Sequence, residues 1–164
     1  MIPPEKEARR QKALQKALEW SHVVVRQVGR LHEAEVKALA SNEHVRLGGT
    51  YTHDHSRPFY EMRSEGYFLL VAARQLLRAL DIYGDRKKVP APRHDPKIMV
   101  ALRNALEHWD GAAPDSFEAK TGSRADEHRW GAGGTFLAGV IEADDLAAWA
   151  AEVESYLLET SGQS

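Results

Sequence analysis

The sequence contains no cysteine, which excludes a disulfide scaffold, a thiolate zinc site and a cysteine nucleophile. It also lacks any run approaching about 18 consecutive apolar residues, the length that a membrane-spanning helix needs. The N-terminal stretch MIPPEKEARRQK has no apolar segment of the kind found in secretory signal peptides. We therefore expect a soluble, cytoplasmic protein that does not enter a membrane.

A strong charge of either sign is absent as well. The net charge is -2 and the isoelectric point is near 6.4, whereas dedicated non-specific nucleic-acid binders are usually basic. Net charge does not exclude a local basic groove. The chain of 164 residues is 43% hydrophobic and 28% charged, which is typical of a globular protein rather than a disordered one. We expect residues 1–164 to form a single helical domain.

Apolar residues spaced three and four apart predict a long first helix over about residues 5–40. This length exceeds that of a typical globular helix, so a break near Gly29 or a partner helix is expected. The predicted buried stripe comprises Leu14, Leu18, Ser21, Val25, Val28, His32, Glu35 and Leu39, widened by Ala17, Trp20, Val24 and Leu31.

A second helix is predicted to follow a glycine-rich loop, with Ser56 as its N-cap and Pro58 in its first turn. Gly84 ends this helix. Gly66 and Ala73 lie on its apolar stripe, where small side chains let another backbone approach closely. The first two helices are therefore expected to form an antiparallel hairpin.

The second half of the chain predicts two further helices. Asp95 and Pro96 begin a third helix, which ends near Trp109. Residues 111–134 lack periodicity, and residues 135–141 predict a short strand, in a hairpin with the preceding segment. Asp144 and Asp145 then open a last helix. The expected fold is mainly all-α: a four-helix bundle with an irregular, partly β-hairpin insertion before the last helix.

The third helix has two distinct faces. On a helical wheel, its core face comprises Ile98, Met99, Leu102, Ala105, Leu106 and Trp109, and its opposite face carries Arg103, Asn104, Glu107 and His108. Val100 and Ala101 lie among these polar residues. We therefore expect the polar face to be covered as well, by another helix or another subunit.

The stretch Arg-Asn-Ala-Leu-Glu-His at residues 103–108 resembles the signature of the HEPN superfamily: an arginine, usually a polar residue, and a histidine four to six residues after the arginine. The resemblance implies a helical bundle in which the motif lies on a late helix and two copies meet across a dimer interface. Many members are ribonucleases that use no metal ion, and others are silent partners or nucleotide-binding modules. The glycine-rich segment after Trp109 departs from a minimal HEPN bundle.

The residue types of this motif suit RNA cleavage by the adjacent 2'-hydroxyl. His108 would transfer protons near neutral pH. Arg103 would stabilise charge on the scissile phosphate, and Asn104 would orient a phosphate or the imidazole. Glu107 would either hold Arg103 or point into solvent near the substrate, and the second is favoured.

Two other arginine–histidine pairs are alternatives to this one. Arg26 with His32 has a spacing of six but lies on the first helix, where the family motif is not found, and Arg46 with His53 is seven residues apart and leads into a glycine-rich loop. His53 and His55 resemble a metal pair, but loop histidines without a third ligand are more often exposed polar residues. No metal site and no cofactor is therefore expected.

Two functions remain open. The first is a HEPN-like ribonuclease of the toxin or defence type, with an RNA substrate and a partner protein such as an antitoxin. The alternative is a non-catalytic helical dimerisation or interaction protein. Both predict a homodimer.

Overall fold

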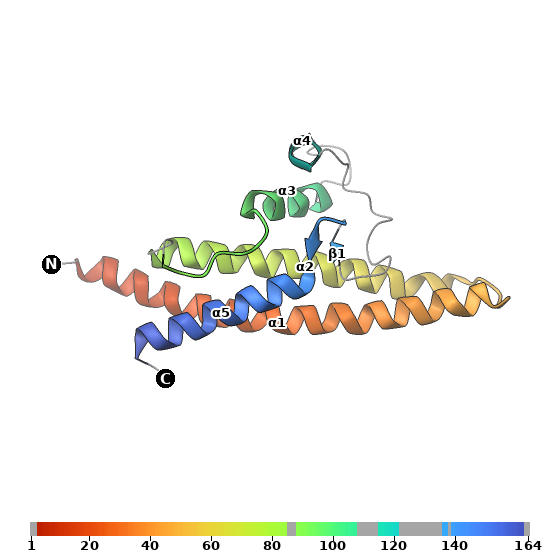
Figure 1. Ribbon diagram of the computed structural model, residues 1–164, viewed down its shortest axis with the longest axis horizontal. Helices are drawn as coiled ribbons and strands as arrows, with labels where there is room; N and C mark the ends of the chain where they lie inside the picture. Colours follow the sequence, from red (N-terminus) through yellow and green to blue (C-terminus); the bar gives the residue numbers. More distant parts are fainter. Residues whose placement is uncertain (1–2, 85–87, 108–114, 122–135, 138, 163–164) are drawn as a thin grey trace.

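The computed structural model describes residues 3–84, 88–107, 115–121, 136–137 and 139–162. Within them the chain is mainly helical, as predicted, with the helices packed into an elongated bundle (Figure 1). No described helix combines the length and the apolarity needed to cross a bilayer. The helices and strands are α1 (Pro4–Arg46), α2 (His53–Tyr83), α3 (Pro96–Glu107), α4 (Asp115–Thr121), β1 (Phe136–Leu137), β2 (Ile141–Glu142) and α5 (Ala143–Ser161).

The long helices α1 and α2 form the predicted hairpin. No break occurs at Gly29, where an added Cβ would meet nothing within 4 Å, and α1 continues six residues beyond the predicted end, to Arg46. Packing against α2 and α5 stabilises a helix of this length, because tertiary contacts rather than propensity supply most helical stability. The buried face of α1 comprises Ala13, Leu14, Ala17, Ser21, Val24, Gln27, Val28, Leu31, Ala34 and Ala38.

This buried face corrects the predicted stripe at two positions. Val25 and Leu39 are about half exposed, because the neighbouring Val24 and Ala38 turn toward the partner helices instead. Gln27 is a buried polar residue whose Nε2 donates to the backbone oxygen of Glu65 at 3.2 Å. That bond satisfies a polar group that would otherwise be costly to bury.

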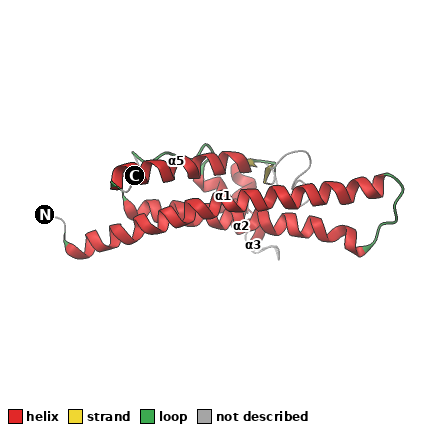
Figure 2. Ribbon diagram, turned by 90° about the horizontal axis from the view of Figure 1, so that it is seen from below, coloured by secondary structure: helices red, strands yellow, loops and turns green. Residues whose placement is uncertain are grey.

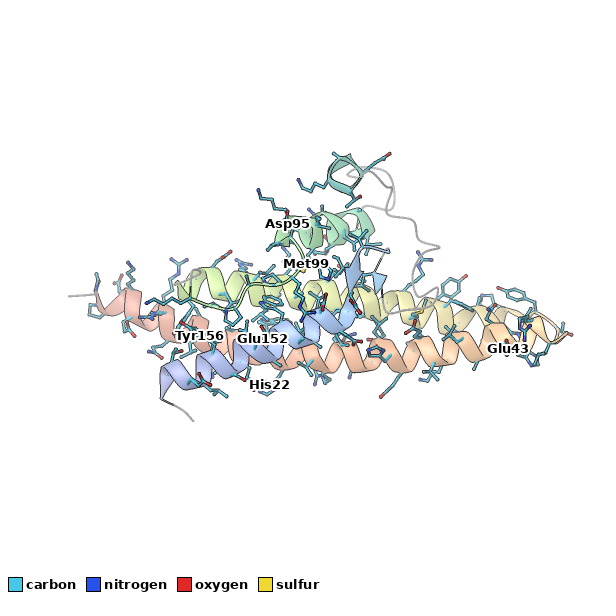
Figure 3. The ribbon with its side chains drawn as sticks, viewed as in Figure 1. His22, Glu43, Asp95, Met99, Glu152 and Tyr156 are labelled. Carbon is cyan, nitrogen blue, oxygen red and sulfur yellow. The ribbon has the colours of Figure 1, made fainter. Side chains whose placement is uncertain are left out.

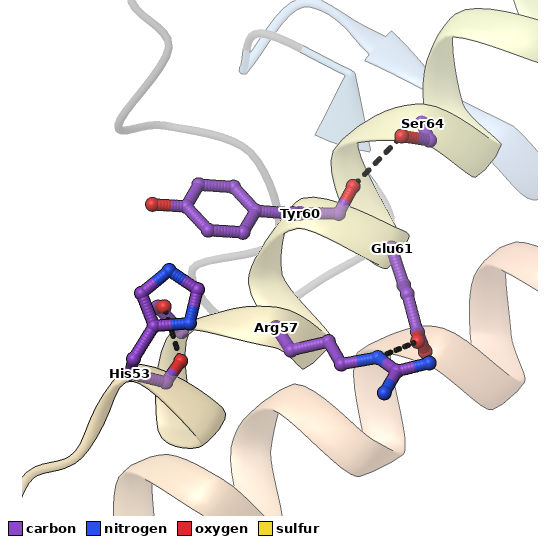
Figure 4. Close-up of polar contacts among 6 residues, drawn as sticks. His53, Arg57, Tyr60, Glu61 and Ser64 are labelled. Carbon is purple, nitrogen blue, oxygen red and sulfur yellow. Dashed lines mark hydrogen bonds and ion pairs between the residues drawn. The ribbon is translucent and has the colours of Figure 1, made fainter.

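The start of α2 differs from the prediction. The N-cap is Thr52, not Ser56, and the backbone N–H of Thr52 donates to Nδ1 of His55 at 3.0 Å. The Ser56 hydroxyl instead donates to the backbone oxygen of His53 at 2.6 Å. Figure 4 shows His53 at the start of the helix, with the Arg57–Glu61 contact one turn further on. His53 and His55 therefore lie in the first turn of a helix rather than in a loop.

Helix α5 packs along α1, as Figure 1 and Figure 2 both show, and the hairpin extends beyond it at the α1–α2 connection. Two histidines of α1 reach α5: His22 Nε2 lies 3.0 Å from a Glu154 oxygen, and His32 Nε2 lies 2.7 Å from an Asp144 oxygen. Leu146, Trp149 and other apolar residues of α5 are buried beneath these polar contacts.

The insertion before α5 holds two features. Strands β1 and β2 pair antiparallel, with Leu137 opposite Ile141, around Gly139 at a φ of 69°. The apolar run thus forms a short hairpin with the residues that follow it, and glycine tolerates the positive φ of the turn. The segment that precedes the run lies outside the described residues. Helix α4 was predicted as irregular structure. Its sequence, DSFEAKT, is too short to display an apolar period.

Candidate functional site

Helix α3 carries the predicted site and packs against α2. Its residues Met99 and Leu102 are fully buried, and Met99 is labelled in Figure 3. Ile98, Ala105 and Leu106 are partly buried beside them, which confirms the predicted core face over the described residues; Trp109 lies outside these. The helix begins at Pro96, and the preceding Asp95 caps it, because its Oδ1 accepts the backbone N–H of Lys97 at 2.8 Å. The N-cap predicted from sequence is confirmed.

The side chains of Arg103, Glu107 and Tyr67 form one polar network between α3 and α2. Nη2 of Arg103 donates to Oε1 of Glu107, and the hydroxyl of Tyr67 donates to the same oxygen at 2.7 Å. Nη1 of Arg103 also donates to Oδ1 of Asn104 at 3.2 Å. Arg103 and Glu107 are 20% and 29% exposed, so solvent screens the pair only in part.

The preference for a solvated Glu107 is therefore wrong. Glu107 lies one turn after Arg103, a spacing that brings two side chains together on a helix surface. Tyr67, from a different helix, then fixes the carboxylate from the other side. The contact could not be foreseen because Tyr67 and Glu107 are 40 residues apart in the chain.

The carboxylate of Glu107 affects the ionisation of Tyr67. The hydrogen bond to Glu107 raises the pKa of Tyr67, and both desolvation and the negative charge of Glu107 add to the effect. The Arg103 cation acts in the opposite direction. A neutral phenol that donates to an ionised carboxylate is the state that these contacts favour.

The predicted proton carrier, His108, lies outside the described residues. The structure therefore places Arg103, Asn104 and Glu107 next to one another and leaves the position of His108 a prediction. Arg103 and Asn104 are both half-buried.

Val100 and Ala101, the apolar residues on the polar face of α3, were expected to be covered by another helix or by another subunit. Ala101 is 4% exposed, so this chain already buries it without a second subunit. Val100 is half-buried, and both Val100 and Ala101 line a pocket next to α2. These two positions consequently give no support to a dimer interface on this face. The homodimer rests on the family resemblance and on the general prevalence of two-fold dimers.

A hollow with aromatic walls lies beside the Arg103 network. Its volume is about 380 Å³, and Tyr60, Tyr67 and Phe68 of α2 line it together with Leu106 of α3. Tyr60 and Phe68 are more than half exposed, and the rings of Tyr67 and Phe68 are 5.7 Å apart. These rings were not predicted as site residues from the sequence, although Tyr67 and Phe68 follow Tyr60 by seven and eight residues, a spacing that places all three along one side of a helix.

The remaining polar clusters hold the fold together. His94 accepts the backbone N–H of Glu142 at 3.2 Å and lies 3.4 Å from Asp145, which joins the linker before α3 to the start of α5. Arg46 pairs with Glu43, and this contact lowers the pKa of the Glu43 carboxyl. Among the described residues, no three histidine or carboxylate side chains are close enough to share a metal ion.

Comparison of the chain with family models, with curated proteins and with solved structures finds no match. The resemblance to HEPN proteins therefore rests on the motif at residues 103–108 and on the helical architecture.

Proposed function

We propose that this chain is a HEPN-like ribonuclease that cleaves single-stranded RNA without a metal ion and acts as a cytoplasmic homodimer of the toxin or defence type. The observation that carries the proposal is the position of Arg103. Its guanidinium is held by Glu107 and Asn104 beside a hollow lined by exposed aromatic rings. Arginine binds phosphate oxygens well, and aromatic rings stack on nucleic-acid bases of any sequence.

The proposed reaction is attack of a ribose 2'-hydroxyl on the adjacent phosphate. A base removes the hydroxyl proton, the new 2'-oxygen–phosphorus bond forms, and the bond to the 5'-oxygen breaks as an acid protonates that oxygen. His108 from each of two subunits would serve as the base and the acid, since histidine exchanges protons near neutral pH. Arg103 would stabilise the charge that develops on the phosphate.

Glu107 and Tyr67 have a positioning role in this proposal. A catalytic cation is most effective when a supporting contact fixes its orientation before the substrate arrives. Glu107 accepts a hydrogen bond from Nη2 of Arg103, and Asn104 accepts one from Nη1. A guanidinium carries five N–H groups, so others can donate to a phosphate.

A second candidate is a non-catalytic helical interaction protein that binds a partner protein or a second copy of this chain. The same ion pair favours it, because Glu107 already neutralises the charge of Arg103 within the chain. In that case Arg103 and Glu107 serve to hold α3 against α2 through Tyr67.

The first test is cleavage of a single-stranded RNA in the presence of a metal chelator. We expect the protein to cleave, His108→Ala to abolish cleavage, and Arg103→Ala to reduce the rate on the order of a hundredfold or more. The matched controls are Arg26→Ala and His53→Ala, which change an exposed arginine of α1 and an exposed histidine of α2. Both controls should retain full activity, and circular dichroism should report the same helix content for all variants.

The same variants separate the two candidates. A wild-type protein that is inert on varied RNA, together with an Arg103→Ala variant that is destabilised or loses only its partner, would support the interaction protein. Light scattering provides the oligomeric state, and a particle of 18.4 kDa would contradict the homodimer in both cases.

A further inference from the structure

A second pocket lies on the other side of α3, where α2, α3 and α4 approach one another. Its volume is about 770 Å³. Four cationic side chains from all three helices line it: Arg74 and Arg78 of α2, Lys97 of α3 and Lys120 of α4. None of the ion pairs or side-chain hydrogen bonds between described residues involves any of these four side chains.

The charge of this pocket differs in sign from that of the whole chain. Among the described residues that line it, Asp81 and Asp95 are the carboxylates, so these residues carry an excess of two positive charges. Asp95 is already engaged at the start of α3, where it accepts the backbone N–H of Lys97. The net charge of the chain is -2, so this positive excess is a local feature. A concave surface lined by one sign of charge attracts ligands of the opposite sign.

The pocket also has apolar walls. Leu77 of α2 and Val100 and Ala101 of α3 contribute them, with Asn104 at the same surface. The volume lies within the range of about 300–1,000 Å³ that small-molecule sites usually have. Unpaired cations beside an apolar wall suit a ligand that is anionic at one end and flat and weakly polar at the other, which is the chemistry of a nucleotide.

We infer that this pocket binds a nucleotide of an RNA strand, with its phosphate on the cations of α2 and α3. A free nucleotide offers the same phosphate chemistry as an RNA strand. The choice of RNA therefore rests on the proposed function. Asn104 connects the two sites, because its side chain lines the pocket and accepts a hydrogen bond from Arg103 at 3.2 Å. A strand that crosses α3 would then place one nucleotide in the pocket and a neighbouring phosphate at Arg103.

The test measures binding and cleavage separately. Binding is followed by fluorescence anisotropy with a labelled single-stranded 2'-O-methyl RNA, which has no free 2'-hydroxyl and so stays intact. The variant is Arg78→Glu/Lys97→Glu, which changes two exposed cations of the pocket. The matched control is Arg26→Glu/Arg30→Glu, which makes the same change in net charge on the exposed face of α1.

We expect the pocket variant to weaken RNA binding at least about tenfold and the control to weaken it less than about threefold. The dependence of log K on log salt should also become shallower by about 1.4, since each phosphate contact on a single strand contributes about 0.7. Equal losses in the two variants, or no loss in either, would overturn the inference.

Two further arms identify the source of the phosphate and keep this inference apart from the proposed function. Adenosine monophosphate that binds as tightly as the RNA would assign the pocket to a free nucleotide and overturn the RNA strand. Unmodified RNA of the same sequence reports cleavage. If the wild type cleaves RNA and the pocket variant binds RNA as tightly as the wild type, the pocket proposal is refuted and the ribonuclease proposal stands. If the wild type never cleaves RNA but the pocket variant loses RNA binding, the ribonuclease proposal is refuted and the pocket proposal stands.

Discussion

Helices α5 and α3 both pack on the α1–α2 hairpin, but α5 contributes more large side chains to the core. The buried residues of α5 include four large apolar side chains, those of Leu146, Trp149, Val153 and Leu157. In the shorter α3 the buried residues are Met99, Ala101 and Leu102, a similar share of the helix. Helix α5 therefore supplies more of the core, whereas α3 also carries the polar network of Arg103 and borders the two hollows beside it.

The polar contacts of the two helices differ in the same way. At the start of α5, Asp145 pairs with Arg93 at 2.5 Å, and the indole nitrogen of Trp149 donates to the backbone oxygen of Pro90 at 2.9 Å. These contacts join α5 to the linker before α3. The contact of Glu107 with Tyr67 instead joins the end of α3 to α2 and at the same time orients Arg103. Proteins often place functional side chains where packing is least extensive.

The largest effect is expected from the core of α5. Leu146→Ala should lower the free energy of unfolding by about 3–5 kcal/mol, because Leu146 is fully buried and the surrounding helices cannot close the cavity. Leu102→Ala on α3 should cost less, about 2–3 kcal/mol, because the shorter helix can shift toward the space. Denaturant unfolding measures both. Equal costs would show that α3 is as firmly packed as α5.

Amide hydrogen exchange compares the two helices without a mutation. The amides of α3 should exchange on the order of tenfold faster than the central amides of α5, because fewer apolar contacts oppose local opening of α3. Mass spectrometry of peptides from the two helices provides the measurement. Equal protection of the amides in α3 and α5 would show that the two helices are packed equally firmly.

Removal of one hydroxyl tests the contact between α3 and α2. Tyr67→Phe should lower the free energy of unfolding by about 0.5–1.5 kcal/mol, because Glu107 loses a donor in a partly shielded position. Tyr60→Phe is the matched control, since Tyr60 lines the same hollow and its side chain is more than half exposed. Thermal unfolding should show no change in the control. If the two variants behave alike, the Tyr67 contact does not stabilise α3.

The smallest effect concerns alkaline pH. Because the folded-state pKa of Tyr67 is raised, the stabilisation from this group is fully present below the ordinary tyrosine pKa of about 10 and is lost as the pH rises through the folded-state value. Tyr67 should ionise late among the five tyrosines in a titration followed by phenolate absorbance. Glu107→Gln should move this step toward ordinary values, because it removes the charged acceptor.

Most of the helices could be predicted from the amino-acid sequence. Repeated apolar spacings of three and four mark α1, α2, α3 and α5, and local signals such as Asp95 before Pro96 set the start of α3 correctly. Such patterns can be read because a helix repeats its surface every 3.6 residues or so and its first turn needs a local acceptor. The motif at residues 103–108 and its place on α3 were accessible for the same reason.

The packing of the helices against one another determines which surfaces meet. It selected Val24 over Val25 for the buried face of α1, and it closed the β1–β2 hairpin around Gly139. It also brought Tyr67 to Glu107, and it placed cations of three separate helices around one pocket. These outcomes depend on the packing of residues tens of positions apart in the chain, and no local spacing encodes such packing, because each helix can present its faces to several partners.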